Sequence, residues 1–320
     1  MYIEESSIDD ILNSVYENLL KKENDERIVC TKGETIEQLG IYIKLLNPLA
    51  RLSTSQTKGK AISPFGEFFW YLSKENSLEF ISHYIPAYKS FSDDGLSVNG
   101  GYGCRIFNMH GKINQLEKII DLLKAKPTTR KAVIQIYDAK DLNNKCSKDI
   151  PCTCTLQFFN RENKLHMFVY MRSNDAFLGL SHDIFCFTMI QEMVSCILGT
   201  EIGHYNHFVS SLHLYDKNIE LAKQYLAEGF QTNKLIMPLM PKNNIVKDIK
   251  KVLSFEKEIR EGKDIEINTI ELPDYWVDVI VLLKIFSLSK VEGKSEEIKN
   301  LVESLKNDIF KVLIEEKYNL

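Results

Sequence analysis

The chain has 320 residues, of which 44% are hydrophobic and 26% are charged, as in an ordinary soluble globular protein with its own core. Its net charge of -4 provides no basic field, so a nucleic acid is not an expected partner. The first residues lack the basic and apolar regions of a signal peptide, no stretch reads as a membrane span, and the seven cysteines lack the spacing of a disulfide framework. We therefore expect a cytoplasmic protein with reduced thiols and no membrane association.

The amino-terminal part of the chain predicts a helix followed by a strand. Ser7 is placed to cap a helix whose apolar residues recur on one face up to Leu19. A basic loop at 27–33 then leads into an alternating strand that ends before Pro48. These elements are expected to serve packing, whereas the loop contains the first candidate ligands for an anion.

The next stretch predicts a helix with an unusual acidic residue. Pro64 suits the first turn of a helix whose aromatic stripe is interrupted by Glu67. A carboxylate on an aromatic face is costly to bury, so the pattern favours a functional Glu67 over a paired structural acid. An amphipathic helix from Ile113 to Leu123 and a strand at 132–137 follow.

A hairpin is predicted at the centre of the chain. The β-rich run 154–160, the polar turn 161–163 and an alternating run to Met171 read as two antiparallel strands. This hairpin brings Cys152 and Arg172 to the same end, where the guanidinium is expected to lower the pKa of the thiol. Cys152 and Cys154 lack a second Cys or His pair at ligand spacing, so no metal is expected.

The remainder of the chain is predicted to be largely helical. The apolar stretch 184–199 reads as a buried helix, and the histidines of the strand after it read as structural. We divide the chain into a catalytic domain, 1–265, and a helical C-terminal extension, 266–320. The helices expected near the C-terminus are one ending at Gly262, one from Pro273 to Ser289 and one from Ser295 to Lys317.

Four short motifs in one order resemble the thymidylate synthase family and its pyrimidine nucleotide hydroxymethylases. They are Pro151-Cys152, then Arg172-Ser173 with Asp175, then Leu178-Gly179-Leu180, then His213 with Tyr215. The resemblance covers roughly 27–225 and is strong because the spacings are compatible throughout. It implies an α/β (α+β) fold, in which a mixed or largely antiparallel sheet is flanked by helices.

The resemblance also implies the reaction. In this family the thiolate that matches Cys152 adds to C6 of a pyrimidine nucleoside monophosphate, and C5 then attacks the methylene of 5,10-methylenetetrahydrofolate. Glu67 lies in Glu-Phe-Phe-Trp, similar to a family motif whose glutamate organises water and protons around the base. Tyr102 matches a tyrosine that helps to remove the C5 proton, with a core tyrosine as the alternative.

The nucleotide-binding residues are likewise implied by the resemblance. Arg172, Ser173 and Asp175 belong to the phosphate end of the site, and His213 with Tyr215 binds the sugar hydroxyl. Arg130 and Lys131 match residues that reach the phosphate of the partner subunit, which implies a homodimer with shared active sites. A solvated loop is the alternative for that pair.

One further phosphate ligand is left open. The family carries an arginine in an N-terminal loop, within a pattern that is absent here. Arg27 and Arg51 are both candidates for that role, and each is equally well interpreted as a solvated surface residue.

Asp183 indicates which base is bound. Thymidylate synthases follow Leu-Gly-Leu with Pro-Phe-Asn, and the asparagine pairs with uracil, whereas this chain has Ser181, His182 and Asp183. A protonated carboxyl, or a carboxylate facing protonated cytosine, complements cytosine. Cytidylate hydroxymethylases resemble the chain in this aspartate, and Thr153 points the same way. The alternative is an aspartate that only stabilises the helix dipole.

The expected activity is therefore that of a cytidylate 5-hydroxymethylase acting on CMP or dCMP. The tail that closes over folate in thymidylate synthases is missing as a pattern, which favours addition of water over transfer of hydride. The alternatives are a thymidylate synthase acting on dUMP and a non-catalytic nucleotide-binding relative.

Overall fold

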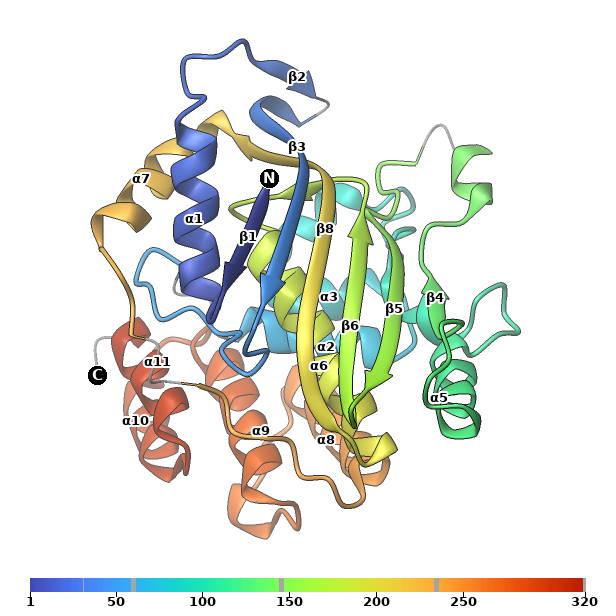
Figure 1. Ribbon diagram of the computed structural model, residues 1–320. Helices are drawn as coiled ribbons and strands as arrows, with labels where there is room; N and C mark the ends of the chain where they lie inside the picture. The colour runs from blue at the N-terminus through green and yellow to red at the C-terminus, as the bar shows by residue number, and fades with distance from the viewer. Residues whose placement is uncertain (31, 59–61, 144–146, 233–235, 319–320) are drawn as a thin grey trace.

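The computed structural model describes residues 1–30, 32–58, 62–143, 147–232 and 236–318. Within these residues, eight strands form one sheet in the order β1-β3-β8-β6-β5-β4, with β2 paired to β3 and β7 paired to β8 (Figure 1). The strands are β1 (Tyr2–Glu5), β2 (Ile28–Cys30), β3 (Gly33–Leu45), β4 (Val133–Gln135), β5 (Thr153–Arg161), β6 (Lys164–Met171), β7 (Asn174–Asp175) and β8 (Glu201–Tyr215).

The sheet is mixed, as predicted. Strand β3 runs parallel to β1 and antiparallel to β8, while β6 runs parallel to β8 and antiparallel to β5. The predicted hairpin is present, and its turn residues Glu162 and Asn163 have φ of 51° and 58°, the left-handed conformation of a tight hairpin turn. The second strand of the hairpin therefore ends at Met171, beside Thr153 at the start of the first strand.

Helices cover one face of the sheet. In Figure 1, α2, α3 and α6 lie behind the strands, and the near face of β8, β6 and β5 carries no helix. The predicted Ser7 cap is confirmed, because its Oγ accepts from Asp10 N (3.2 Å), and Pro64 lies in the first turn of α2. The helices of this part are α1 (Ile8–Leu20), α2 (Ser63–Leu72), α3 (Leu78–Tyr84), α4 (Tyr102–Phe107), α5 (Gln115–Ala125), α6 (Leu180–Leu198) and α7 (Ile219–Ala227), with short 3-10 turns such as η1 (Pro86–Phe91).

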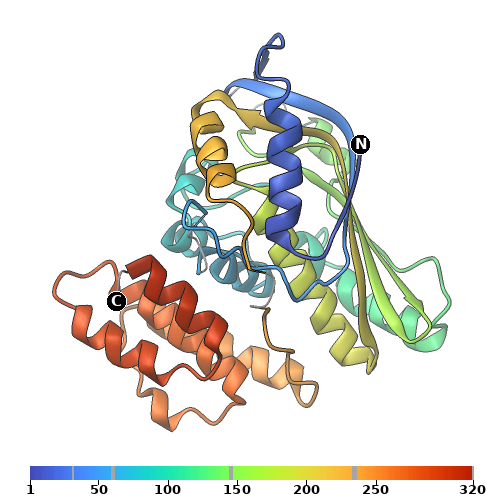
Figure 2. The same cartoon turned by 60° about the vertical axis from the view of Figure 1, so that its left-hand side comes forward.

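Four helices gather at one end of the molecule, as Figure 2 shows. They are α8 (Ile245–Arg260), α9 (Asp274–Leu288), α10 (Ser295–Ser304) and α11 (Asp308–Tyr318). The prediction of one helix from Ser295 to Lys317 is wrong. The buried carboxylate of Asp278 accepts from Lys306 N (2.9 Å) and Asn307 N (3.0 Å), so a tertiary contact from α9 stabilises the break.

The described helices do not include one that is both long enough and apolar enough to cross a membrane. The most apolar of them, α6 and α9, are instead buried against the sheet and against neighbouring helices. The position of the boundary between catalytic domain and extension stays a prediction.

Candidate active site

The hairpin brings Cys152 and Arg172 together, as predicted. Arg172 N donates to the carbonyl of Cys152 (2.9 Å), which joins the end of β6 to the residue before β5. The guanidinium donates from Nε to Pro151 O (2.9 Å) and from Nη2 to Ile150 O (3.0 Å). These bonds hold an exposed arginine beside the thiol, with donors left over for an anion.

The thiol itself is not activated in the free protein. Burial raises the pKa of Cys152 to about 11, and the positive charge of Arg172 offsets only part of this effect. Asp183 and Asp149 raise the same pKa, while Lys32 lowers it. Arg172 thus lowers the pKa of Cys152 as expected, but desolvation outweighs the guanidinium and the net pKa is raised.

The surroundings of Asp183 favour its neutral form. Burial raises its pKa well above the ordinary value, and the nearby Glu67 carboxylate adds to the shift, whereas Asn174 opposes it. Asn174 Nδ2 donates to Asp183 Oδ2 (2.7 Å). Of the two alternatives predicted for this residue, the protonated carboxyl is the one that the burial favours. A neutral carboxyl also contributes little to a helix dipole, which weakens the structural interpretation.

Glu67 is ionised although it is buried. Its Oε1 accepts from Tyr71 (3.0 Å) and Tyr88 (2.7 Å), and its Oε2 accepts from Nδ1 of His182 (2.9 Å). Burial alone would raise the pKa of this carboxyl, but the bonds from His182, Tyr88 and Tyr71 outweigh it and lower the pKa. The sequence analysis missed Tyr88 and left His182 without a role, because neither contact is local.

Tyr102 begins α4 and lies beside the start of β5. Its hydroxyl accepts from Thr153 N (3.3 Å) and from Thr153 Oγ1 (3.0 Å). Burial raises its pKa, and the charges of Asp183 and Cys152 contribute, so these groups are electrostatic neighbours. The structure thus brings Cys152, Glu67, Tyr102 and Asp183 into one connected group.

The predicted sugar-binding and phosphate-binding residues meet where β7 pairs with β8. Ser173 Oγ lies 3.4 Å from His213 Nδ1, and the His213 and Tyr215 rings are 5.1 Å apart between centroids. Asp175 Oδ1 accepts from two backbone N–H groups of the turn before α6 (2.8 and 2.9 Å). Asp175 therefore also orders the turn that leads to Asp183.

Lys32 is a site residue that the sequence analysis missed. It lies between β2 and β3, and its ammonium interacts electrostatically with Asp149, Cys152 and Asp175. Burial lowers its pKa, which indicates a partly desolvated cation. The sequence shows that the loop 27–33 is basic. Only the tertiary structure shows that Lys32, and not Arg27 or Arg51, lies near Cys152.

The two arginines considered for the phosphate are engaged elsewhere. Arg27 Nε donates to Asp216 Oδ1 (2.8 Å). Arg51 is 0% exposed in its side chain and pairs with Glu192, so the interpretation as a solvated surface residue is wrong. Its Nε and Nη1 have no hydrogen-bond partner among the described residues.

Arg130 and Lys131 are exposed at the start of β4. In the described part of the chain, no hydrogen bond or ion pair joins their side chains to Cys152, Ser173 or Arg172. This placement fits residues that act outside their own subunit, and the assignment stays a prediction.

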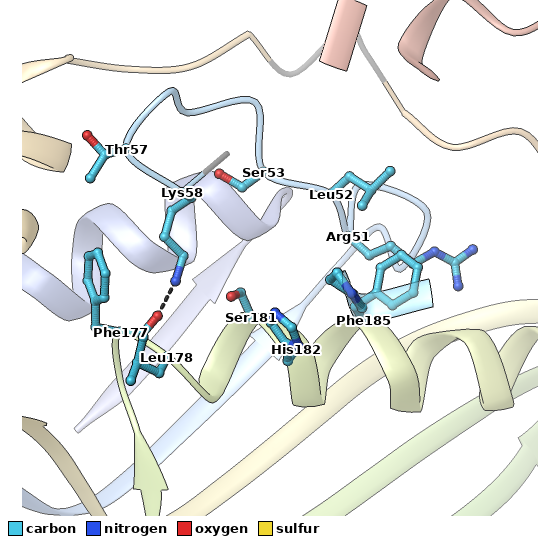
Figure 3. A pocket seen from close by; sticks show the side chains of 11 residues that line it. Arg51, Leu52, Ser53, Thr57, Lys58, Phe177, Leu178, Ser181, His182 and Phe185 are labelled. Atoms are coloured by element: carbon cyan, nitrogen blue, oxygen red, sulfur yellow. Dashed lines mark hydrogen bonds between the residues drawn. The ribbon is translucent and has the colours of Figure 1, made fainter. Parts of the chain in front are cut away.

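A small cavity lies between the loop 51–58 and the first turn of α6 (Figure 3). Its volume is about 50 Å³, and Ser181 and His182 form part of its wall. Cys152 does not line this cavity, whereas His182 both lines it and binds Glu67. The cavity therefore touches the connected group only through His182, because Glu67 itself does not line it.

The fold and the site define a class of protein. The sequence profile described as thymidylate synthase matches residues 7–278, and the chain belongs to this family. The predicted resemblance is thereby confirmed, together with its mixed sheet flanked by helices.

Particular relatives carry a more specific name. A deoxyuridylate hydroxymethyltransferase of Bacillus phage SP01 is 34% identical over 221 residues, which cover 64% of this chain and 55% of the relative. A protein of the same name from Delftia phage PhiW-14 is 31% identical over 199 residues, covering 58% and 55%. A third, from Pseudomonas phage M6, is 32% identical over 153 residues, covering 47% and 43%. The chain spans about half the length of the curated relatives it matches.

Proposed function

We propose that this protein transfers a one-carbon unit from 5,10-methylenetetrahydrofolate to C5 of a pyrimidine nucleoside monophosphate and then adds water, giving the 5-hydroxymethyl nucleotide. The observation that carries the proposal is the placement of the buried Cys152 between a neutral Asp183 and the cations Arg172 and Lys32. A pyrimidine monophosphate offers groups that complement these residues, namely an electrophilic C6, a polar base edge and an anionic phosphate. The family and its named relatives support this chemistry.

The reaction begins with addition of the Cys152 sulfur to C6, with loss of the thiol proton. Because the thiol is neutral in the free protein, proton loss must accompany binding and addition, and Arg172 beside the sulfur favours the anion. Addition makes C5 nucleophilic towards the one-carbon unit. Tyr102, held by Thr153 next to Cys152, is placed to assist removal of the C5 proton.

The nucleotide is held at its other end by residues of the β7 and β8 region. Arg172 and Ser173 bind phosphate, and Lys32 is added to them as a third donor from the same molecule. His213 and Tyr215 bind the sugar hydroxyl. Burial lowers the pKa of His213, so its ring is neutral and has one nitrogen available as an acceptor.

The fit to a folate rests on the wall of the small cavity. The rings of Phe177 and Phe185 and the polar groups of Ser181 and His182 in this wall suit one edge of an aromatic co-substrate, most of which extends beyond the cavity (Figure 3). When bound, 5,10-methylenetetrahydrofolate supplies carbon at the oxidation level of formaldehyde. Arg51 is fully buried and paired with Glu192, so it is not placed to contact either the phosphate or the folate.

Cytosine is the base that we propose first. A neutral Asp183 carboxyl donates to N3 and accepts from the N4 amino group, and Asn174 fixes its orientation. Uracil is the second candidate, because the relatives are named deoxyuridylate hydroxymethyltransferases. A neutral carboxyl whose proton is on the other oxygen can also accept from N3–H of uracil and donate to O4.

Analysis of the products tests the reaction directly. With CMP, dCMP or dUMP and methylenetetrahydrofolate, we expect a nucleotide heavier by one CH₂O unit and tetrahydrofolate as co-product. Mass spectrometry identifies the nucleotide, and absorbance distinguishes tetrahydrofolate from dihydrofolate during turnover. Dihydrofolate formed in step with a methylated nucleotide would indicate a thymidylate synthase, and no release of the C5 proton would indicate a non-catalytic nucleotide-binding relative.

We also propose a homodimer formed through the open face of the sheet. Phe168, Tyr170 and Phe208 are about 40% exposed, and the Tyr170 and Phe208 rings stack across β6 and β8. A contiguous aromatic patch on an uncovered sheet is typical of an interface between proteins. Arg130 and Lys131 lie just before the edge strand β4 of the same sheet, where a partner is within reach.

Mixing two inactive variants tests the shared site. We expect Cys152→Ser and the double variant Arg130→Ala, Lys131→Ala each to be impaired, whereas their mixed dimer contains one intact site. Random exchange of subunits should then restore about a quarter of the normal number of sites. Activity that stays at the sum of the separate variants would place both basic residues outside a shared site.

A further inference from the structure

The pair formed by Glu67 and His182 is a buried feature that the proposed reaction has so far not used in full. Their side chains are 7% and 13% exposed, and Nδ1 lies 2.9 Å from Oε2. Because a carboxylate only accepts, Nδ1 must carry the proton and donate it to the bond. The other ring nitrogen, Nε2, lies 3.4 Å from Ser63 Oγ at the start of α2.

The surroundings of Glu67 make His182 the decisive partner. The groups that face the carboxylate are Tyr71 on its own helix, Tyr88 on η1, and His182, Asp183 and Cys186 on α6. Among these, only the imidazole can carry positive charge, since the phenols, the thiol and Asp183 are neutral or would be anionic. His182 in turn faces Ser63, Glu67 and a cavity wall that includes Arg51 and Lys58.

The cavity beside this pair has polar residues at two positions where thymidylate synthases have Pro-Phe. Ser181 and His182 follow Leu180 here, and both line the cavity of about 50 Å³ (Figure 3). Water requires polar partners, which Ser181 and His182 supply, and a space of about 50 Å³ for the centres of water molecules admits water. The first turn of α6 therefore places hydrogen-bonding groups and space for water next to His182, the partner of Glu67.

We propose that Ser181 and His182 admit water at the first turn of α6 and that His182 positions the Glu67 carboxylate to take a proton from the water that reacts. This inference rests on the proposed function and concerns its last step, after the folate has left. The water oxygen bonds to the exocyclic methylene on C5, and one of its protons passes to Glu67. The electron pair moves into the ring, reforms the C5–C6 double bond and expels the Cys152 sulfur as thiolate.

The step needs no reductant, because the carbon stays at the oxidation level of formaldehyde. Formation of a methyl group would instead require a hydride donor over the ring and exclusion of water. Polar residues in the first turn of α6 favour addition of water over formation of a methyl group. His182 is thus a positioning residue that acts through Glu67, and Ser181 acts through the water.

Three variants separate this role from simple packing. His182→Phe removes the donor to Glu67, whereas His182→Gln keeps an amide donor. Ser181→Pro with His182→Phe restores both apolar residues, and proline is tolerated in the first turn of a helix. His204→Gln, at the opposite end of β8 from His213, is the matched control.

The first measurement is the pKa of the Glu67 carboxyl, followed by ¹³C NMR in the free protein. In His182→Phe only the bonds from Tyr71 and Tyr88 still offset burial, so we expect this pKa to rise by at least about one pH unit and the acid limb of kcat to move up with it. His182→Gln should stay close to the unsubstituted protein. An unchanged Glu67 pKa in His182→Phe would overturn the positioning role.

The second measurement is the partition of the product. We expect kcat for hydroxymethyl formation to fall about 10- to 100-fold in His182→Phe. The double variant should form a larger share of methyl nucleotide or retain more of the covalent adduct. An unchanged rate and product ratio in the double variant would refute the water-admitting role. If the unsubstituted protein makes no hydroxymethyl nucleotide, the proposed function fails, and the NMR titration still reports on the pair independently.

Discussion

Cys152→Ser is expected to abolish turnover almost completely, by about 10⁴-fold or more, while leaving nucleotide affinity within about threefold. A serine hydroxyl in this buried position is a far weaker nucleophile than sulfur, whose anion is favoured by Arg172 during addition. The phosphate and sugar ligands, including Ser173 and His213, are untouched by the change. Initial rates and nucleotide binding by calorimetry measure the two quantities separately.

Cys154→Ser is the matched control, because Cys154 lies two residues further along the same hairpin and its thiol is also protonated. We expect its activity to stay within a few fold of the unsubstituted protein. Mass spectrometry of the denatured reaction mixture should detect a nucleotide adduct that disappears only in Cys152→Ser. Equal loss in both variants would implicate the cysteine pair, and retained turnover in Cys152→Ser would exclude covalent catalysis by Cys152.

Asp183→Asn is expected to change the preferred base, lowering the ratio of kcat/KM for cytidylate over dUMP by about 100-fold. An amide next to Asn174 turns its oxygen towards Nδ2 of that residue, which fixes the order of donor and acceptor. Two mismatched buried hydrogen bonds together cost about 3 kcal/mol, the equivalent of that ratio. Competition assays with dCMP, CMP and dUMP measure the preference. A preference of the unsubstituted protein for dUMP would leave uracil as the base.

The same variant has a predicted effect on stability. The folded-state pKa of Asp183 is raised, so the folded protein binds its proton more tightly than the unfolded chain. Stability is therefore lost as pH rises from the ordinary carboxyl pKa towards the raised value, and Asp183→Asn should remove this loss. Asp274→Asn, in the first turn of α9, controls for the helix dipole and should cost about 0.3–1 kcal/mol. Thermal unfolding between pH 5 and about pH 8 compares the three proteins.

Much of the architecture follows from local sequence patterns. The Ser7 cap, the proline at the start of α2 and the alternating hairpin are signals within a few residues, and the structure has each element where the pattern places it. The order of the four motifs also identified the family, because it reflects residues whose chemistry needs particular side chains at particular strand ends.

The tertiary structure decided everything that depends on burial and on distant partners. Periodicity does not reveal that desolvation holds Cys152 protonated, that Arg51 pairs with Glu192, or that Asp278 ends a helix near residue 305. Each of these outcomes depends on groups far apart in the chain, whose mutual field and exclusion from water exist only after folding.

The residues Glu67 and His182 show the same division. The sequence by itself determined that an acidic residue interrupts an aromatic helix and that a histidine follows Leu-Gly-Leu, and it favoured a function for the first alone. Only the folded chain, by packing α2 against α6 over a separation of 115 residues, placed Nδ1 of the histidine on the carboxylate. Burial strengthens that bond because water no longer competes for it, and so the fold made an ionised base from a side chain that burial alone would have neutralised.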